Sequence, residues 1–187
     1  MYNIYMLLLL FLQTLWLALP AAVSNMVPPI ATKIIPTVLN IPVDFSKSFR
    51  GKRILGNNKT LRGLLFGIFA GEIVFVLQQM LYQQQVFKTL SILSYSRLPW
   101  YFGFLFGIGA LGGDMVKSFA KRQLGIPPGK TWIPFDQVDW IVGLLIVLIP
   151  FVAIPMEIII FGFVLGLLLH MIIKFTGFLL GLDKQPI

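Results

Sequence analysis

Cysteine is absent from this chain of 187 residues, and histidine occurs once, at position 170. Disulfides and thiolate metal sites are therefore excluded, and a zinc site is not expected. Charged residues are also scarce, at 12% of the chain, against roughly 25% in soluble domains. Because 57% of the residues are hydrophobic, a water-soluble fold of this length could not bury its apolar surface, and lipid is the expected solvent for much of the chain.

Five apolar stretches are long enough, or nearly so, to cross a hydrocarbon core of about 30 Å as helices. They run approximately over residues 5–26, 61–81, 100–120, 138–155 and 156–180. We therefore predict an all-α membrane helix bundle with five transmembrane helices. Two polar loops, about 27–60 and 121–137, would belong to one catalytic domain over residues 1–187. Pro150 and Pro155 indicate a kinked end to the fourth span and a tight turn into the fifth.

Glycines recur at four-residue spacing within three of these stretches. They are Gly63, Gly67 and Gly71 in the second stretch, Gly109 and Gly113 in the third, and Gly162 and Gly166 in the fifth. Small residues at this spacing let helix backbones approach closely in lipid, so we expect helix-packing faces. A backbone surface kept bare for a ligand is the alternative. Such faces serve a homodimer as well as packing within one chain, and the sequence leaves a homodimer open.

Basic residues are unequally distributed among the connections. With five spans, the first loop holds seven, the third loop four and the C-terminal end two, which places thirteen of the fifteen Lys and Arg on one side. The positive-inside rule makes that side cytoplasmic, with the N-terminus outside and the C-terminus inside. A signal peptide cleaved near Ala21 and Ala22 is disfavoured, because no basic residue precedes the first apolar core and cleavage would move the first loop outside.

The first polar segment, residues 44–63, mixes basic residues with glycine, asparagine and threonine. Glycines let the backbone approach an anion and donate N–H groups to it. Lys59 and Thr60 lie just before the second span, near a helix N-terminus, where free N–H groups and the helix dipole favour anions. This segment is either a phosphate-binding loop or a loop that sets topology and contacts anionic lipid heads.

The second polar segment, residues 113–139, contains three carboxylates. Residues spaced i, i+4, i+7 and i+8 share one helix face, and here they are Asp114, Ser118, Lys121 and Arg122. Asp136 and Asp139 are three residues apart at the start of the fourth span, where they can face the same way. Between them and the first acid, a Pro-Pro-Gly turn presents Lys130.

Three carboxylates beside many basic residues suit a site for Mg²⁺ and phosphate. Mg²⁺ prefers carboxylate and phosphate oxygens and keeps several waters, while Lys and Arg neutralise the remaining phosphate charge. A structural interpretation stays open, in which Asp136 caps a helix and Asp114 pairs with Lys117 or Lys121. Glu72, inside the second span, would either line the site or bond a neighbouring helix.

Both polar segments resemble a known signature. The pattern Asp114…Ser118…Lys121-Arg122…Pro128-Gly-Lys130…Pro134…Asp136-Gln-Val-Asp139 is similar to that of the CTP:phosphatidate cytidylyltransferase superfamily. Arg53-Ile-Leu-Gly56 and Lys59-Thr-Leu-Arg-Gly63 resemble its archaeal branch, the CDP-archaeol synthases. Larger bacterial and eukaryotic relatives have an acid after the lysine, a His-Gly-Gly before the final pair of acids and an Arg at the place of Gln137. Their absence here favours the archaeal branch.

The resemblance implies a cell-membrane enzyme of phospholipid biosynthesis whose active site faces the cytoplasm. The phosphate of an isoprenoid ether lipid, 2,3-bis-O-geranylgeranylglycerol 1-phosphate, would attack the α-phosphorus of CTP. Pyrophosphate would leave, and CDP-archaeol would stay in the membrane. Nucleotidyl transfer needs positioning and charge neutralisation more than covalent chemistry, and Mg²⁺ would polarise the α-phosphate and stabilise the departing pyrophosphate.

The same resemblance implies roles for individual residues. The expected Mg²⁺ ligands, direct or through water, are Asp114, Asp136 and Asp139. The expected phosphate-binding residues for CTP or the lipid are Lys121, Arg122 and Lys130, with Lys59, Thr60 and Arg62 on the triphosphate. Polar contacts to the base or ribose are expected from Asn57, Asn58 and Gln137, and the substrate-binding set is completed by Arg53 and Ser118. The expected partners include membrane lipids and no nucleic acid.

Two other functions agree less well with the sequence. A lipid-linked phosphotransferase that uses a CDP-alcohol needs four aspartates in an Asp-Gly…Asp arrangement, which this chain does not supply. A small transporter or anion channel with a one-sided basic vestibule would carry charges along a path through the bilayer. The charged residues instead collect at one face, and no inverted repeat is evident.

Overall fold

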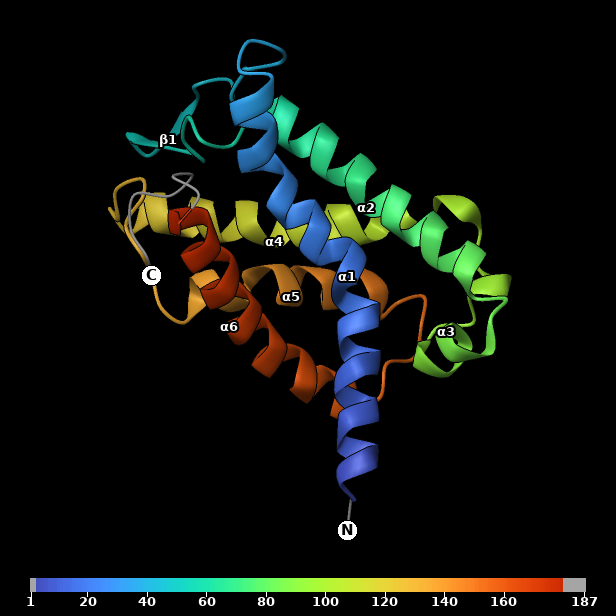
Figure 1. The fold of residues 1–187 in the computed structure, drawn as a ribbon. Helices are drawn as coiled ribbons and strands as arrows, with labels where there is room; N and C mark the ends of the chain where they lie inside the picture. The colour runs from blue at the N-terminus through green and yellow to red at the C-terminus, as the bar shows by residue number, and fades with distance from the viewer. Residues whose placement is uncertain (1–2, 180–187) are drawn as a thin grey trace.

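The computed structural model describes residues 3–179, which are predominantly helical (Figure 1). The long helices are α1 (Ile4–Ile34), α2 (Leu61–Leu81), α4 (Gly103–Gln123), α5 (Phe135–Leu148) and α6 (Met156–Leu179). The short elements are the antiparallel hairpin of β1 (Ser48–Phe49) and β2 (Lys52–Arg53), helix α3 (Gln85–Leu90) and the 3-10 turns Tyr95–Arg97 and Trp100–Phe102.

Glycines bring the helices into close contact, as the spacing predicts. Helices α4 and α5 run antiparallel, and a Cβ added at Gly109 would lie 2.9 Å from the carbonyl oxygen of Gly143 (Figure 1). Helices α1 and α2 pack in the same manner, because a Cβ added at Gly67 would lie 2.7 Å from the carbonyl oxygen of Ser24. The predicted packing of Gly67 and Gly109 against neighbouring helices is confirmed, and both contacts form within a single chain.

The first helix is longer than the predicted span of 5–26. It continues through Pro28 and Pro29 to Ile34, so the first polar loop covers residues 35–60 rather than 27–60. The Arg62 guanidinium donates to the carbonyls that follow the helix, those of Ile35, at 2.9 Å, and Pro36, at 2.6 Å. Carbonyls at a helix C-terminus lack partners within the helix, and a buried basic group supplies them here.

The later boundaries also differ from the prediction, except that α2 matches residues 61–81. Helix α4 continues to Gln123 and α5 begins at Phe135, so the second polar loop covers 124–134 rather than 121–137. Helix α5 ends at Leu148, not 155, and the segment up to Pro155 forms the predicted turn into α6. The predicted cytoplasmic C-terminus, with Lys184, lies outside the described residues.

Apolar composition differs sharply among the helices. Within residues 3–179, α1 and α2 are long and apolar enough to cross a membrane by length and composition, and Met156–Leu169 of α6 is a shorter apolar run. Helix α4 does not meet this standard because four charged residues lie in its second half, and α5 has only 14 residues. The charges predicted at a loop are thus largely built into helices.

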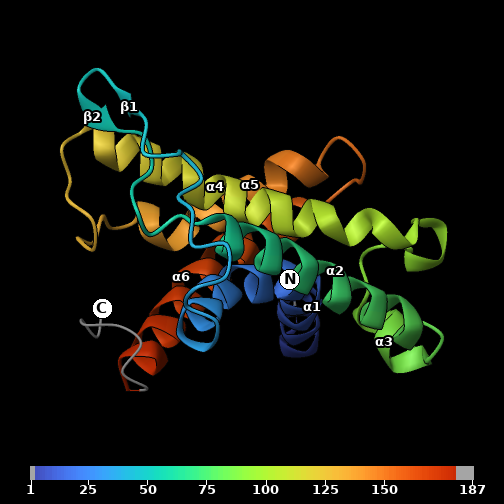
Figure 2. The same ribbon diagram turned by 90° about the horizontal axis from the view of Figure 1, so that it is seen from above.

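The two polar loops meet at one end of the molecule. Lys52 Nζ donates to the carbonyl of Gln123, and the Phe49 ring lies 6.0 Å from that of Phe119, so the hairpin sits on the C-terminal end of α4 (Figure 2). Helix α3 lies at the opposite end of α2 and α4 (Figure 1). This arrangement separates the two polar loops from the connection between α2 and α4, which contains α3.

Candidate functional site

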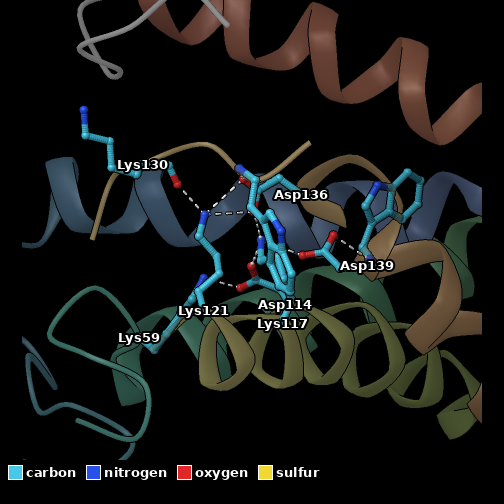
Figure 3. A network of polar contacts seen from close by, with 9 residues as sticks. Lys59, Asp114, Lys117, Lys121, Lys130, Asp136 and Asp139 are labelled. Atoms are coloured by element: carbon cyan, nitrogen blue, oxygen red, sulfur yellow. Dashed lines mark hydrogen bonds and ion pairs between the residues drawn. The ribbon is translucent and has the colours of Figure 1, made fainter. Parts of the chain in front are cut away.

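Three carboxylates surround one ammonium group where α4 meets α5 (Figure 3). Lys117 Nζ lies 3.1 Å from Asp114 Oδ1, 3.0 Å from Asp136 Oδ1 and 2.7 Å from Asp139 Oδ2. The side chains of the three acids are 14%, 9% and 5% exposed, in that order. The structure therefore brings together the acids that the sequence analysis singled out.

Helix periodicity and one glycine account for this convergence. Lys117 follows Asp114 by three residues, which puts both on one face of α4. Asp136 and Asp139 occupy the start of α5 with the same three-residue spacing. A Cβ added at Gly113 would overlap the carbonyl oxygen of Asp139, so this glycine is required for the two faces to touch.

Two further lysines complete the cluster. Lys59, from the first polar loop, forms an ion pair with Asp114, and Lys121 Nζ lies 3.0 Å from Asp136 Oδ2 (Figure 3). Asp136 also accepts the backbone N–H of Trp132. Three acids thus face three ammonium groups, which offsets the cost of holding so many charges away from water.

Asp139 has one lysine partner, whereas Asp114 and Asp136 have two each. Its Oδ1 accepts the backbone N–H of Trp140 at 2.7 Å. Its Oδ2 is buried and lies 2.7 Å from Lys117 Nζ. Lys117 is therefore the ionic partner on which Asp139 depends.

The three carboxylates offer the kind of oxygen ligands that a divalent cation would need, around the point that the Lys117 ammonium now occupies. As the side chains stand, no group of three or more Asp, Glu, His or Cys residues within the described part of the chain could hold a metal ion. The ammonium of Lys117 nevertheless marks a point within 3.1 Å of an oxygen from each acid. Carboxylate oxygens are the ligands that Mg²⁺ prefers, so the donor set suits this ion once Lys117 moves aside.

A polar pocket of about 130 Å³ opens beside the cluster. Four basic side chains contribute to its wall: Lys59, Lys117, Lys121 and Arg122. The predicted substrate-binding residues Asn57, Asn58 and Ser118 also line it. Gly56 and Gly129 adopt positive φ values of 101° and 82°, which only glycine tolerates readily, and they shape the two loops at its rim.

An apolar groove of about 470 Å³ runs along α4 and α5. Its wall includes Ile108, Val116, Val142 and Ile146, with Trp132 and Phe135 near the polar end. Lys117 and Asp139 also line this groove. Lys117 therefore borders both cavities, and the charged cluster separates a polar space from an apolar one.

Arg62 lies away from both cavities, contrary to its expected contact with a triphosphate. The residue is 1% exposed, and its guanidinium bonds the carbonyls that follow α1 and the side chains of Thr32 and Asn40. Its donors are directed to the chain itself, because the loop from α1 returns over the start of α2. These contacts give Arg62 structural partners, and its expected contact with a triphosphate stays a prediction.

Thr60 and Arg53, which were also predicted as site residues, have partners within the chain. Thr60 caps α2, since its hydroxyl accepts the N–H of Gly63. Arg53 pairs with Asp44, and Gln137 is buried in α5 and does not line the polar pocket. The exposed side chain of Lys130 points away from the cluster, whereas its carbonyl accepts a hydrogen bond from Lys121 (Figure 3).

Asp44 organises the loop that forms one wall of the polar pocket. Burial acts to raise the pKa of its carboxyl group, but the Arg53 guanidinium and the backbone N–H groups of Gly56, Leu55 and Ser46 outweigh it and hold the pKa well below its usual range. A carboxylate with several donors is strongly favoured in its charged form. This acid fixes the loop.

Two charged residues acquire roles that the sequence did not determine. Lys117 is the centre of the cluster, and its position three residues after Asp114 was the available signal. Glu72 is buried in α2 and faces the first turn of α4, since a Cβ added at Gly103 would lie 2.6 Å from Glu72 Oε2. Glu72 therefore lies beside α4 and lines neither the polar pocket nor the apolar groove.

The sequence and fold match known proteins. The family model described as "CarS-like: CDP-archaeol synthase" matches residues 5–186. The CDP-archaeol synthase of Pyrococcus furiosus is 36% identical over 145 residues, 77% of this chain and 78% of the relative. That of Methanocaldococcus jannaschii is 33% identical over 92% of this chain and 95% of the relative. A solved structure of an intramembrane enzyme for archaeal membrane lipid biosynthesis is 32% identical, with a TM-score of 0.57 over 81% of this chain and 90% of that one.

Proposed function

The chain belongs to the CDP-archaeol synthase family, and on that premise we propose that it is a membrane enzyme that transfers CMP from CTP to the phosphate of an archaeal ether lipid. The products are CDP-archaeol and pyrophosphate. One observation carries the assignment to this site: the polar pocket and the apolar groove meet at Lys117, within the cluster of acids. A water-soluble nucleotide and a lipid require such a pair of adjoining spaces.

Each cavity suits one substrate. The triphosphate of CTP binds in the polar pocket, where Lys59, Lys121 and Arg122 neutralise its charge. The lipid, 2,3-bis-O-geranylgeranylglycerol 1-phosphate, lies with its isoprenoid tails along the groove of α4 and α5. Its phosphate then reaches the polar end of the groove, beside Lys117 and Asp139.

The reaction is a displacement at phosphorus. An oxygen of the lipid phosphate attacks the α-phosphorus of CTP, the bond to the bridging oxygen of the β-phosphate breaks, and pyrophosphate leaves with that electron pair. The nucleophile is already an anion, so no strong general base is needed. The basic side chains position the two anions and offset their repulsion, which is the main requirement of phosphoryl and nucleotidyl transfer.

Mg²⁺ is the proposed cofactor, held by Asp114, Asp136 and Asp139, directly or through water. Their convergence on the single cationic group of Lys117 supports this set. When bound, Mg²⁺ polarises the α-phosphate and stabilises the charge on the departing pyrophosphate. The chain's own acids orient the ion, and its basic residues hold the phosphates.

Five membrane crossings with the site facing the cytoplasm are the proposed topology. The apolar character of α1, α2 and the first part of α6 supports it, as does the grouping of the basic loops at one end. The absence of cysteine permits a direct test with single-cysteine variants and a membrane-impermeant maleimide. Lys47→Cys should react only after permeabilisation, and Lys88→Cys should react in intact spheroplasts; the reverse pattern would invert the orientation.

The proposed activity is tested with the detergent-purified chain, labelled CTP, the ether-lipid phosphate and Mg²⁺. Formation of a labelled lipid together with one equivalent of pyrophosphate is the expected result. Omission of Mg²⁺ in the presence of a chelator should abolish the product, and a water-soluble glycerol phosphate without tails should be a poor substrate. No labelled lipid under any of these conditions would refute the assignment.

A further inference from the structure

Lys117 is surrounded by acids in a way that the other lysines of the cluster are not. Its ammonium lies within 3.1 Å of three different carboxylates, whereas Lys121 also donates to the carbonyl of Lys130. We propose that Lys117 is a built-in counter-ion, which holds the three carboxylates together before the metal arrives and is displaced when metal and nucleotide bind. This inference rests on the proposed function, because it concerns the same three acids.

The charges of the cluster require such a group. Lys59 pairs with Asp114 and Lys121 pairs with Asp136, which leaves Lys117 as the ionic partner of Asp139. Asp139 Oδ2 is buried and lies 2.7 Å from Lys117 Nζ. Removal of the Lys117 ammonium would therefore leave a buried carboxylate opposed by two others, a costly arrangement unless another cation replaces it.

Once displaced from the acids, the Lys117 side chain can reach either substrate site. Lys117 lines both the polar pocket and the apolar groove, so its ammonium can turn from the acids toward either substrate phosphate by rotation of its flexible stem. A cation then takes its place between the carboxylates. CTP, by offering Lys117 a new anionic partner, would favour metal binding, and the metal would favour CTP binding by the same factor.

Competition between Lys117 and the metal can be measured without turnover. Mn²⁺ is the probe, and its free concentration is followed by electron paramagnetic resonance with the full-length protein in detergent. In the absence of CTP, Lys117→Met should bind Mn²⁺ at least about tenfold more tightly than the wild type, a change equivalent to about 1.4 kcal/mol. CTP should strengthen Mn²⁺ binding in the wild type more than in this variant. The matched control is Lys88→Met, which removes an exposed lysine of α3 at the other end of the molecule.

Thermal stability gives a second readout. In chelator, the Tm of Lys117→Met should fall by about 5 °C or more, and Mn²⁺ should restore it. The double variant Lys117→Met/Asp139→Asn removes one acid as well, so in chelator it should be more stable than the single variant. This comparison keeps the proposal testable if the single variant folds only with metal.

The results distinguish failure of the proposed metal site from failure of the counter-ion role of Lys117. If the wild type binds no Mn²⁺ even with CTP, the proposed metal site is refuted. If the wild type binds Mn²⁺ with CTP, but Lys117→Met has the same Mn²⁺ affinity and the same Tm in chelator as Lys88→Met, only the counter-ion role of Lys117 is refuted. A double variant no more stable than Lys117→Met would also overturn this role.

Discussion

Buried charges at the polar end of the molecule are satisfied in two different ways. Around the first polar loop, Arg62 at the start of α2 donates to backbone carbonyls of the loop, and Asp44 accepts three backbone N–H groups in addition to its pair with Arg53. Where α4 meets α5, the acids bond mainly to lysine side chains, with Lys117 at the centre. Arg62 and Asp44 are bonded largely to the main chain. The acids around Lys117 are bonded to lysine side chains that can rotate away, and we call these acids and lysines the exchangeable set.

This difference separates structural charge from functional charge. A backbone partner is fixed by the fold, so a side chain bonded to it cannot be released to a substrate without local unfolding. A lysine partner can be exchanged for a metal or a phosphate, because its ammonium moves with little disturbance of the helices. The two cavities open beside the exchangeable set, which agrees with this distinction.

The largest effect is expected from Asp139→Asn. The change removes one proposed metal ligand while keeping the shape of the side chain, so turnover should fall by at least about 10³-fold, with Tm within a few degrees of the wild type. Labelled-lipid formation and thermal unfolding are measured together, with Lys88→Met as the control. Full activity of this variant would show that Asp139 is not a metal ligand. The charges around Lys117 would then be structural, like those of the first polar loop.

Arg62→Met, where α2 meets the first polar loop, is expected to lower the stability rather than the activity. Loss of several charge-assisted hydrogen bonds to buried carbonyls should lower the free energy of unfolding by about 3 kcal/mol or more, which corresponds to a fall in Tm of roughly 10 °C. Arg50→Met, on the exposed tip of the same loop, is the matched control and should change Tm by little. An unchanged Tm for Arg62→Met with weakened CTP binding would return Arg62 to the phosphate site.

A substitution at a helix contact tests what holds the exchangeable set together. A methyl group at Gly143 would overlap the carbonyl oxygen of Gly109, whereas one at Gly112 on α4 meets open space. Gly143→Ala should lower the stability by about 1–3 kcal/mol, and Gly112→Ala should be neutral or slightly stabilising. Tm is the measured quantity. Equal Tm values for the two variants would mean that α4 and α5 can separate without cost.

The helices were predictable from sequence where local pattern decides the structure. The bounds of α2 follow from a continuous apolar run, and the convergence of Asp136 and Asp139 follows from their spacing. The end of α1 was not predictable, because the helix continues past two prolines and the contacts just beyond its end come from Arg62, which is distant in sequence. Hydropathy predicted the third span over 100–120, but it ended that span before the charged last turn of α4, which continues to Gln123.

The site was predictable in its residue types and less so in its individual roles. The three acids come together as the spacing predicts, and Asn57, Asn58 and Lys59 line the polar pocket. The structure gives Arg62 and Thr60 partners within the chain that their place at the start of α2 did not reveal, and their contacts to substrate stay predictions. Tertiary contacts decide whether that partner is a carbonyl of the chain or an external phosphate.

The smallest effect concerns Asp44, and its sign depends on pH. Because the folded pKa of Asp44 lies below its unfolded value of about 3.9, its contribution to stability is fully present above that value and is lost as the pH falls toward the folded pKa. At pH 7, Asp44→Asn should lower the stability by about 1–2 kcal/mol, a modest value because Arg53, at 32% side-chain exposure, is partly screened by solvent. The difference in Tm between the wild type and this variant should therefore be constant from pH 7 to about pH 5 and should narrow below about pH 4. A gap that stays constant down to pH 3 would contradict a depressed pKa, and a lasting loss of lipid product in the folded variant at pH 7 would place Asp44 among the exchangeable charges.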